Sequence, residues 1–119
     1  MTTTIYYLSA TGNSLYMARR IQQQLEQTGQ VVRLVSIAKA LREQDLCPAG
    51  RVGFVMPLHF FGLPLLGEEF LSRLDLSQVT YSFLVMTCGW HYMSDAFHAA
   101  RRLFAAQGGK LSAAFYVDM

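Results

Sequence analysis

The sequence contains few charged residues and only two cysteines, and both facts limit the classes of protein to which it can belong. Charged residues make up 15% of the 119 residues and hydrophobic residues 52%, so the chain has enough apolar surface to fold and disorder is excluded. Ten Lys and Arg against eight Asp and Glu leave a net charge of +2, without the clustered positive charge of a nucleic-acid-binding protein. Cys47 and Cys88 form no CxxC pair, so the sequence holds no cysteine set for zinc or an iron–sulfur cluster.

The sequence also lacks a long uninterrupted hydrophobic run and a signal peptide. The most apolar stretch, residues 52–66, contains Pro57, His59, Gly62 and Pro64, so it does not predict a membrane-spanning helix. The N-terminus has neither a basic region nor a long apolar region of the signal-peptide kind. Two lone thiols fit a reducing compartment. We therefore expect one cytoplasmic domain, residues 1–119, that binds neither nucleic acid nor a membrane.

What the sequence does contain is a regular alternation of strand and helix patterns. Apolar runs predict strands over residues 5–8, 31–35, 52–56, 81–86 and 111–117. Apolar residues at spacings of three and four predict helices from residue 13 to a stop at Gly29, and over 36–43, 67–74 and 94–107. This alternation is typical of parallel strands joined by right-handed crossovers. It predicts a doubly wound α/β domain with helices on both faces of one five-stranded sheet.

The turn after the first predicted strand is rich in hydrogen-bond donors. Its hydroxyl groups belong to Ser9, Thr11 and Ser14, and Gly12 and Asn13 lie between them. Free backbone N–H groups at the following helix start would favour an anion at the same place. The turn lacks the lysine of a P-loop and two of the three glycines of a dinucleotide-binding turn. It suits a terminal phosphate held by neutral donors, although Ser, Thr and Asn are also ordinary helix N-cap residues.

The loops after the third and fourth predicted strands are rich in aromatic residues. They begin at Pro57 and Thr87, and in a parallel sheet both lie at the same edge as the first turn. Their rings could stack on a planar heterocycle, and their glycines could let the backbone approach its rim; alternatively, the rings pack on neighbouring helices. The aromatic residues and glycines in question are Phe60, Phe61, Gly62, Gly89 and Trp90. A phosphate site beside stacking loops predicts flavin mononucleotide (FMN) as the ligand.

At these residues the sequence resembles the flavodoxin family along its whole length. The segment from Ser9 to Ser14 is similar to the family's phosphate loop, Ser/Thr-x-Thr-Gly-Asn-Ser/Thr, and it follows the first strand as the loop does there. More narrowly, the chain resembles the flavodoxin domain that precedes a two-cluster ferredoxin module in bacterial fusion proteins. The segments that carry this narrower likeness are residues 11–15, Pro57 with 62–64, 69–71, 87–89 and 110–112.

The resemblance implies a flavodoxin-like sheet of strand order 2-1-3-4-5 with bound FMN. It implies the transfer of one or two electrons between redox partner proteins, one candidate being a ferredoxin-type iron–sulfur module. The phosphate would be held by Ser9, Thr11, Gly12, Asn13, Ser14 and Leu15. The isoalloxazine ring would be surrounded by Pro57, Leu58, His59, Phe60, Phe61, Gly62, Thr87, Cys88, Gly89 and Trp90.

The sequence departs from the family pattern in three respects. His59 and Phe61 stand where those domains commonly carry Tyr and Trp, which leaves the stacking residue open. Flavodoxins are usually acidic, whereas this chain has a pI near 8.7, which predicts easier flavin reduction. No helix is predicted after the fifth strand, although the fold normally ends with one. We therefore expect that these 119 residues leave part of one sheet face uncovered. We expect that a second copy, in a homodimer, or residues beyond this chain cover that face.

The residue pattern points to no catalytic or metal site. No carboxylate or cysteine lies at ligand spacing with His59, His91 or His98, so no metal is predicted. Cys88 has no evident paired base, which disfavours a nucleophile. The leading hypothesis is a non-catalytic electron-transfer domain; the alternative is an FMN-dependent NAD(P)H:quinone-type reductase. A receiver-like signalling domain is set aside, because Met56 and Pro57 stand where its phosphoacceptor aspartate is needed.

Overall fold

Strands and helices alternate along the chain, and each helix follows a strand. The computed structural model describes residues 2–8, 12–58, 63–88 and 96–118. The elements in order are β1 (Thr2–Tyr7), α1 (Asn13–Gln27), β2 (Val31–Ser36), α2 (Ile37–Arg42), β3 (Gly50–Pro57), α3 (Leu65–Arg73), β4 (Val79–Cys88), α4 (Ala96–Ala106) and β5 (Ala113–Asp118). This order confirms the predicted alternation.

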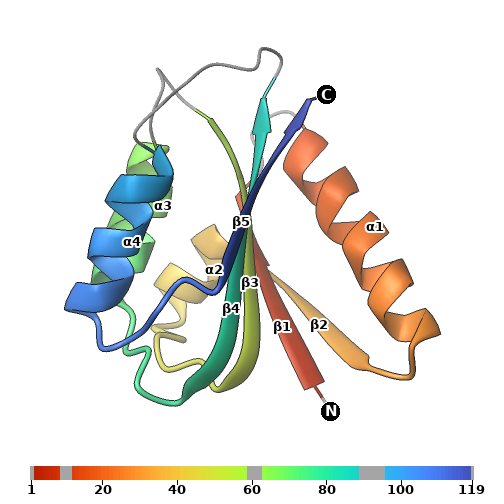
Figure 1. Cartoon of the computed structure of the whole chain (residues 1–119), viewed down its shortest axis with the longest axis horizontal. Coiled ribbons are helices and arrows are strands. Elements are labelled where there is room, and N and C mark those ends of the chain that lie inside the picture. Colours follow the sequence, from red (N-terminus) through yellow and green to blue (C-terminus); the bar gives the residue numbers. More distant parts are fainter. Residues whose placement is uncertain (1, 9–11, 59–62, 89–95, 119) are drawn as a thin grey trace.

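The strands form one parallel sheet at the centre of the molecule (Figure 1). The strand order is β2-β1-β3-β4-β5, and every neighbouring pair is parallel. The predicted order 2-1-3-4-5 is therefore confirmed. Because all strands run in the same direction, their carboxyl ends lie at one edge of the sheet.

Helices cover both faces of this sheet, as predicted. The helix α1 lies on one face, and α2, α3 and α4 lie on the other (Figure 1). Successive strand side chains point to opposite faces, so Phe54 and Met56 pack toward α2–α4 while Val55 packs toward α1. The larger core holds an aromatic cluster in which Tyr6 and Phe54 stack with ring centroids 5.7 Å apart. Burial on both faces explains why the third strand reads as a continuous apolar run.

The ends of the helices follow ordinary capping chemistry at two places. The Ser36 side chain accepts a hydrogen bond from the Lys39 backbone N–H, which begins α2 where the sequence predicts it. Gly29, with φ of 89°, adopts the left-handed conformation that ends α1. The helix α3 begins at Leu65, two residues before the predicted start at Gly67. A Cβ on Gly67 would lie 2.9 Å from the Met56 sulfur, so glycine there lets α3 pack closely on β3.

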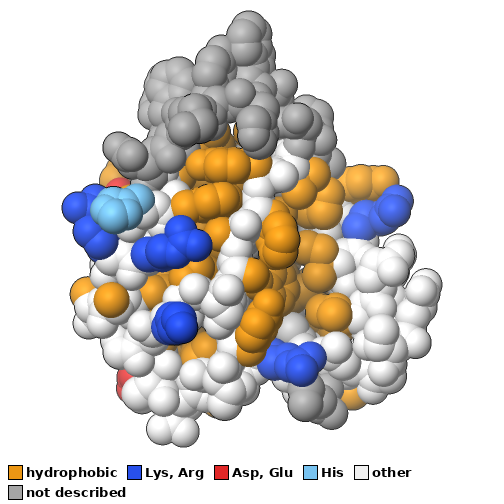
Figure 2. Space-filling view, in the orientation of Figure 1, with side chains coloured by type: hydrophobic (Ala, Val, Ile, Leu, Met, Phe, Trp, Pro, Cys, Tyr) orange, Lys and Arg blue, Asp and Glu red, His pale blue; other side chains and the backbone are white. Residues whose placement is uncertain are grey.

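One part of the sheet is not covered by any helix that the structure describes. On the α1 side, the described helices leave β5 and the first half of β4 open, and Phe115 is 54% exposed there. Hydrophobic side chains form a stripe at this place on the surface (Figure 2). No described helix has both the length and the apolar character needed to cross a lipid bilayer.

Candidate functional site

The strands β1, β3 and β4 end side by side, so the loops that follow them leave the same edge of the sheet. The Leu8 N–H donates to the Val55 carbonyl at 2.9 Å, and the Leu58 N–H donates to the Thr87 carbonyl at 2.9 Å. Pro57 and Thr87 are register partners at the ends of β3 and β4. These bonds extend the ladder to the last strand residues, so the described ends of β1, β3 and β4 lie at the same edge.

The first turn of α1 has no side-chain cap among the described residues. Gly12 precedes the helix with φ of 94°, and its carbonyl accepts the Tyr16 N–H at 2.9 Å. Among the described residues no side chain caps this helix start, and its first turn contains no acidic residue. The backbone N–H groups of the first turn have no intrahelical acceptor, and the helix dipole is positive at this end. This helix start therefore offers several donors to a negatively charged group.

Backbone conformation, and not a lack of space for a side chain, explains the glycine at position 12. A Cβ built on it would meet nothing within 4 Å, yet its φ lies in the left-handed region that L side chains rarely adopt. Glycine at this position therefore lets the chain turn from β1 into α1.

A buried pair of hydroxyls fixes the start of α1 to the end of β4. The Ser14 Oγ lies 3.2 Å from the Thr87 Oγ1, and either hydroxyl can be the donor. Ser14 is 1% exposed and Thr87 is 4% exposed, so both are shielded from water. The contact joins two of the three predicted binding segments. Sequence reasoning named both residues but missed their pairing, since the only available signal was that both follow or end strands at the same sheet edge.

The end of β4 is also tied to β5. The Cys88 thiol lies 3.8 Å from the Val117 carbonyl oxygen, within range of a weak hydrogen bond. Cys88 is half-buried, and so are Pro57 and Leu58 at the end of β3 and Leu15 in α1. The edge is thus a partly enclosed surface of mixed character, with apolar side chains close to backbone donors.

The predicted site residues divide between the described part of the chain and the part outside it. The structure describes Gly12, Asn13, Ser14, Leu15, Pro57, Leu58, Thr87 and Cys88, and it brings their elements together at the carboxyl edge. Eight predicted residues lie outside the described residues: Ser9, Thr11, His59, Phe60, Phe61, Gly62, Gly89 and Trp90.

Among the described residues, the titratable groups with shifted pKa values lie away from this edge. Burial raises the pKa of Tyr6 to about 12, and the negative charge of Asp45 adds to that shift. Hydrogen bonds from Ser77 hold the pKa of Asp75, which follows α3, below its usual range. Within the described ranges no group of three or more His, Cys, Asp or Glu is arranged to hold a metal ion. The chemistry of the described edge is therefore that of backbone donors, hydroxyls and apolar surface.

Comparison with known proteins assigns the fold. No family model matches the chain. No curated protein sequence matches it either. Among solved structures, a flavodoxin of Streptococcus pneumoniae TIGR4 superimposes with a TM-score of 0.74 at 19% identity, covering 100% of this chain and 86% of that one.

Two further structures show the same architecture in different settings. The two-electron reduced flavodoxin of Megasphaera elsdenii gives a TM-score of 0.74 at 19% identity, over 98% of this chain and 87% of that one. Rubredoxin oxygen:oxidoreductase of Desulfovibrio gigas gives 0.73 at 17% identity, over 98% of this chain and 30% of that one. The strand order, the crossovers and these superpositions together show that the chain has the flavodoxin fold.

Proposed function

We propose that the chain binds FMN at the carboxyl edge of its sheet and relays one or two electrons between redox proteins. One observation carries the proposal: among the described residues no side chain caps the start of α1, and its first turn holds no acidic residue. This helix start is entered through a left-handed glycine and is fixed to β4 by the Ser14–Thr87 pair. In the flavodoxin fold this edge lies where three loops converge.

The phosphate would be held mainly by backbone donors. The N–H groups of Asn13, Ser14 and Leu15 lie in the first turn of α1, where a phosphate gains both hydrogen bonds and the helix dipole. The Ser14 hydroxyl is buried against Thr87, so Ser14 would contribute its N–H and position the helix. The hydroxyl contacts would come from Ser9 and Thr11, which lie outside the described residues.

The ring would lie between the loops that follow β3 and β4. Pro57 ends β3 and Leu58 follows it, while Thr87 and Cys88 end β4. Thr87 is buried, and the other three residues are half-buried. Such apolar surface would exclude water from one side of a flat heterocycle, and the aromatic loops would supply stacking. When bound, FMN supplies the capacity to take up and release electrons singly or in pairs. The residues of the chain bind it, orient it and limit its contact with water.

The proposed partners are proteins that donate or accept electrons, a ferredoxin-type iron–sulfur module being one candidate. Support comes from the neighbours: two are flavodoxins, and a third is an oxidoreductase of which this chain covers only 30%. A domain of this fold can therefore stand alone or form part of a larger redox protein.

The test is reconstitution of the whole chain with excess FMN, followed by removal of unbound flavin. We expect a retained flavin absorption spectrum, quenched flavin fluorescence and a higher unfolding temperature, because a ligand that binds only the folded state stabilises it. At a free FMN concentration of about 100 times Kd, the added stability is about 2.7 kcal/mol.

Two glycine variants make this test specific. Gly12→Ala and Gly29→Ala place a Cβ at almost the same φ, 94° and 89°, with nothing within 4 Å in either case. Both should lower the free energy of unfolding by about 1 kcal/mol through backbone strain alone. Only Gly12→Ala should also weaken FMN, by about tenfold, because it disturbs the helix start at the phosphate.

The proposal fails if the chain retains no flavin, or if both glycine variants bind FMN as the parent does. Sustained oxidation of NAD(P)H with a quinone by the purified chain would instead favour the reductase.

A further inference from the structure

The helix α4 presents basic side chains on one exposed face, and its described residues include no acidic one. His98, Arg101 and Arg102 follow the spacing i, i+3, i+4, which places them beside one another on the surface of a helix. All three are exposed. Figure 2 shows Lys and Arg side chains next to the histidine on this side of the molecule. We call these three residues the α4 basic stripe.

The fold does not use these charges for its own stability. Neither Arg101 nor Arg102 is within ion-pair distance of an acidic residue in the described part of the chain. Both arginines lie before the last turn of α4, and only in that turn would the helix dipole favour a cation. Arg102 follows His98 by four residues, a spacing at which an acidic residue would stabilise the helix and a second basic one does not. The charges of the stripe are therefore available to a partner.

The apolar side chains of α4 face away from the stripe. Ala100 and Phe104 are fully buried in the larger core, and the Phe97 ring stacks on Tyr116 of β5 with ring centroids 4.2 Å apart. No large hydrophobic side chain in the described length of α4 is exposed. A lipid surface would need an apolar face beside the cations, and a single-stranded nucleic acid would need rings on which its bases stack. The stripe therefore fits a polar, charge-dependent contact with a protein.

The stripe lies close to the carboxyl edge of the sheet. The helix α4 connects the parallel strands β4 and β5, so it begins at the edge where β4 ends and runs back along the sheet (Figure 1). Arg101 and Arg102 follow Ala96 by five and six residues, which is about 8–9 Å along the helix axis. A transient interface buries about 600 Å² on each partner, a patch about 28 Å across. One partner can therefore cover the stripe and the carboxyl edge together.

The sign of the stripe selects the chemistry of the partner. The adjacent helix α3 carries charges of both signs, Glu68 and Glu69 together with Arg73, which lies 3.9 Å from Glu69. Two copies of the chain joined through their stripes would bring Arg101 and Arg102 against the same arginines of the other copy, and like charges in an interface disfavour association. A partner with acidic side chains would instead gain from both arginines.

We propose that the α4 basic stripe docks the acidic surface of an electron-transfer protein, next to the carboxyl edge. That the partner carries electrons rests on the proposed function, whereas the docking itself requires no FMN. Opposite charges speed the encounter of two proteins, and salt screens their attraction. Binding through the stripe is therefore polar and sensitive to ionic strength.

The probes are a strongly acidic two-iron ferredoxin and a basic cytochrome c, each titrated into the whole chain labelled with a fluorophore at its N-terminal amine. Fluorescence anisotropy should show binding about tenfold or more tighter for the ferredoxin at an ionic strength of about 20 mM, where the Debye length is about 20 Å. At about 200 mM, where that length is about 7 Å, most of this preference should be lost. Both titrations are made with and without FMN.

A matched pair of double variants locates the binding. Arg101→Glu with Arg102→Glu should weaken the ferredoxin about tenfold at an ionic strength of about 100 mM. Arg19→Glu with Arg20→Glu changes the other adjacent arginine pair, on α1 across the sheet, where Arg20 already donates to the Tyr16 hydroxyl at 3.3 Å. This control should weaken the ferredoxin less than about twofold. Arg101→Lys with Arg102→Lys keeps both charges and should retain most of the affinity.

Equal binding of the ferredoxin and the cytochrome, or of neither, overturns the proposal. So does an equal loss of affinity in the α1 and α4 double variants, or a labelled single-stranded DNA that binds through the α4 arginines as tightly as the ferredoxin does. If the chain retains no FMN, the proposed function fails, and the titrations without flavin still decide whether the stripe docks an acidic protein. If FMN is retained and the α4 double variant binds the ferredoxin as the parent does, only the docking proposal fails.

Discussion

The Ser14–Thr87 pair is the smallest feature on which the proposed site depends. The two hydroxyls lie 73 positions apart in sequence and 3.2 Å apart in space, shielded from water. A buried hydroxyl that loses its partner retains the full cost of leaving water, about 1–3 kcal/mol. The pair therefore ties the position of α1 to β4 at the point where the phosphate would bind.

A double-mutant cycle measures this coupling. Ser14→Ala and Thr87→Val should each lower the free energy of unfolding by about 1–2 kcal/mol, because each leaves one buried hydroxyl unpaired. The double variant should cost less than the sum of the two, since neither hydroxyl then remains. Urea unfolding of the four proteins provides the numbers. Strict additivity would show that the two hydroxyls do not stabilise each other.

Sequence reasoning could identify these residues but not their arrangement. The hydroxyls, glycine and asparagine from Ser9 to Ser14 predict a donor-rich turn before a helix, and the structure describes that helix from Asn13. That Ser14 turns its hydroxyl toward Thr87 depends on the packing of α1 against β4, which no local pattern records. Half-buried Arg51, which lines a cavity on the sheet face, was likewise missed, because a single charge in a strand carries no signal until its neighbours are known.

Helices and strands could be predicted from the sequence where their apolar residues follow a single clear pattern. The strand β3 is apolar on both faces and α1 repeats its apolar residues every three or four positions, so both were predicted with small errors at their ends. The start of α3 was predicted two residues late, at Gly67, because Leu65 and Leu66 after Pro64 carry no local signal that separates the end of a loop from the first turn of a helix. The open sheet face was expected from the absence of a helix pattern after the last strand.

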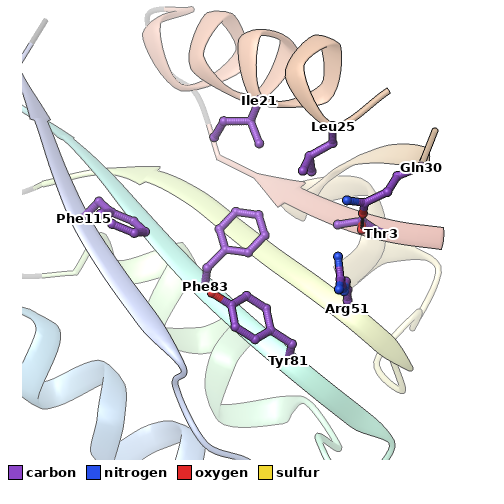
Figure 3. A pocket seen from close by; sticks show the side chains of 8 residues that line it. All are labelled: Thr3, Ile21, Leu25, Gln30, Arg51, Tyr81, Phe83 and Phe115. Carbon is purple, nitrogen blue, oxygen red and sulfur yellow. Dashed lines mark hydrogen bonds between the residues drawn. The ribbon is translucent and has the colours of Figure 1, made fainter. Parts of the chain in front are cut away.

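Within β3, Gly53 has a role that its local sequence does not reveal. Its register partner on β4 is Phe83, and a Cβ on Gly53 would lie 2.1 Å from the Phe83 ring. The ring therefore lies over the bare backbone of its neighbour, where it lines a cavity together with Ile21 and Leu25 of α1 (Figure 3). Glycine in the middle of a buried strand here makes room for a neighbouring aromatic ring.

We predict that Gly53→Ala displaces the Phe83 ring and lowers the free energy of unfolding by about 1–3 kcal/mol, as overpacking does. The same substitution in a Phe83→Ala background should cost much less, because the obstructing ring is gone. Chemical denaturation of the four proteins tests this coupling. An equal cost in both backgrounds would mean that backbone preference, and not the ring, explains the glycine.

For the molecule as a whole, Tyr6 links pH to global stability. Its side chain is 1% exposed and contacts Phe54 and Phe70 in the larger core, where burial raises its pKa from the usual 10.0 to about 12. The folded state therefore holds the phenolic proton more tightly than the unfolded state does. Its contribution to stability is complete below about pH 10 and is lost as the pH rises toward about 12.

Tyr6→Phe should remove this dependence. Between about pH 8 and about pH 11 the parent chain should lose more unfolding free energy than the variant, since only the parent has this proton to release on unfolding. Urea midpoints at the two pH values measure the difference, and titrations common to both proteins cancel. An equal loss of unfolding free energy in the two proteins would mean that folding does not raise the pKa of Tyr6.

The strand order also has a consequence for how the chain folds. Paired residues lie 29 positions apart for β1 with β2, 48 for β1 with β3, 29 or 30 for β3 with β4 and 30 for β4 with β5. Loop-closure entropy separates the shortest of these pairings from the longest by only about 0.4 kcal/mol. Loop-closure entropy therefore does not determine which pair of strands forms first. The folding nucleus is expected where apolar burial is greatest, at β3 and β4, with the outer strands joining afterwards.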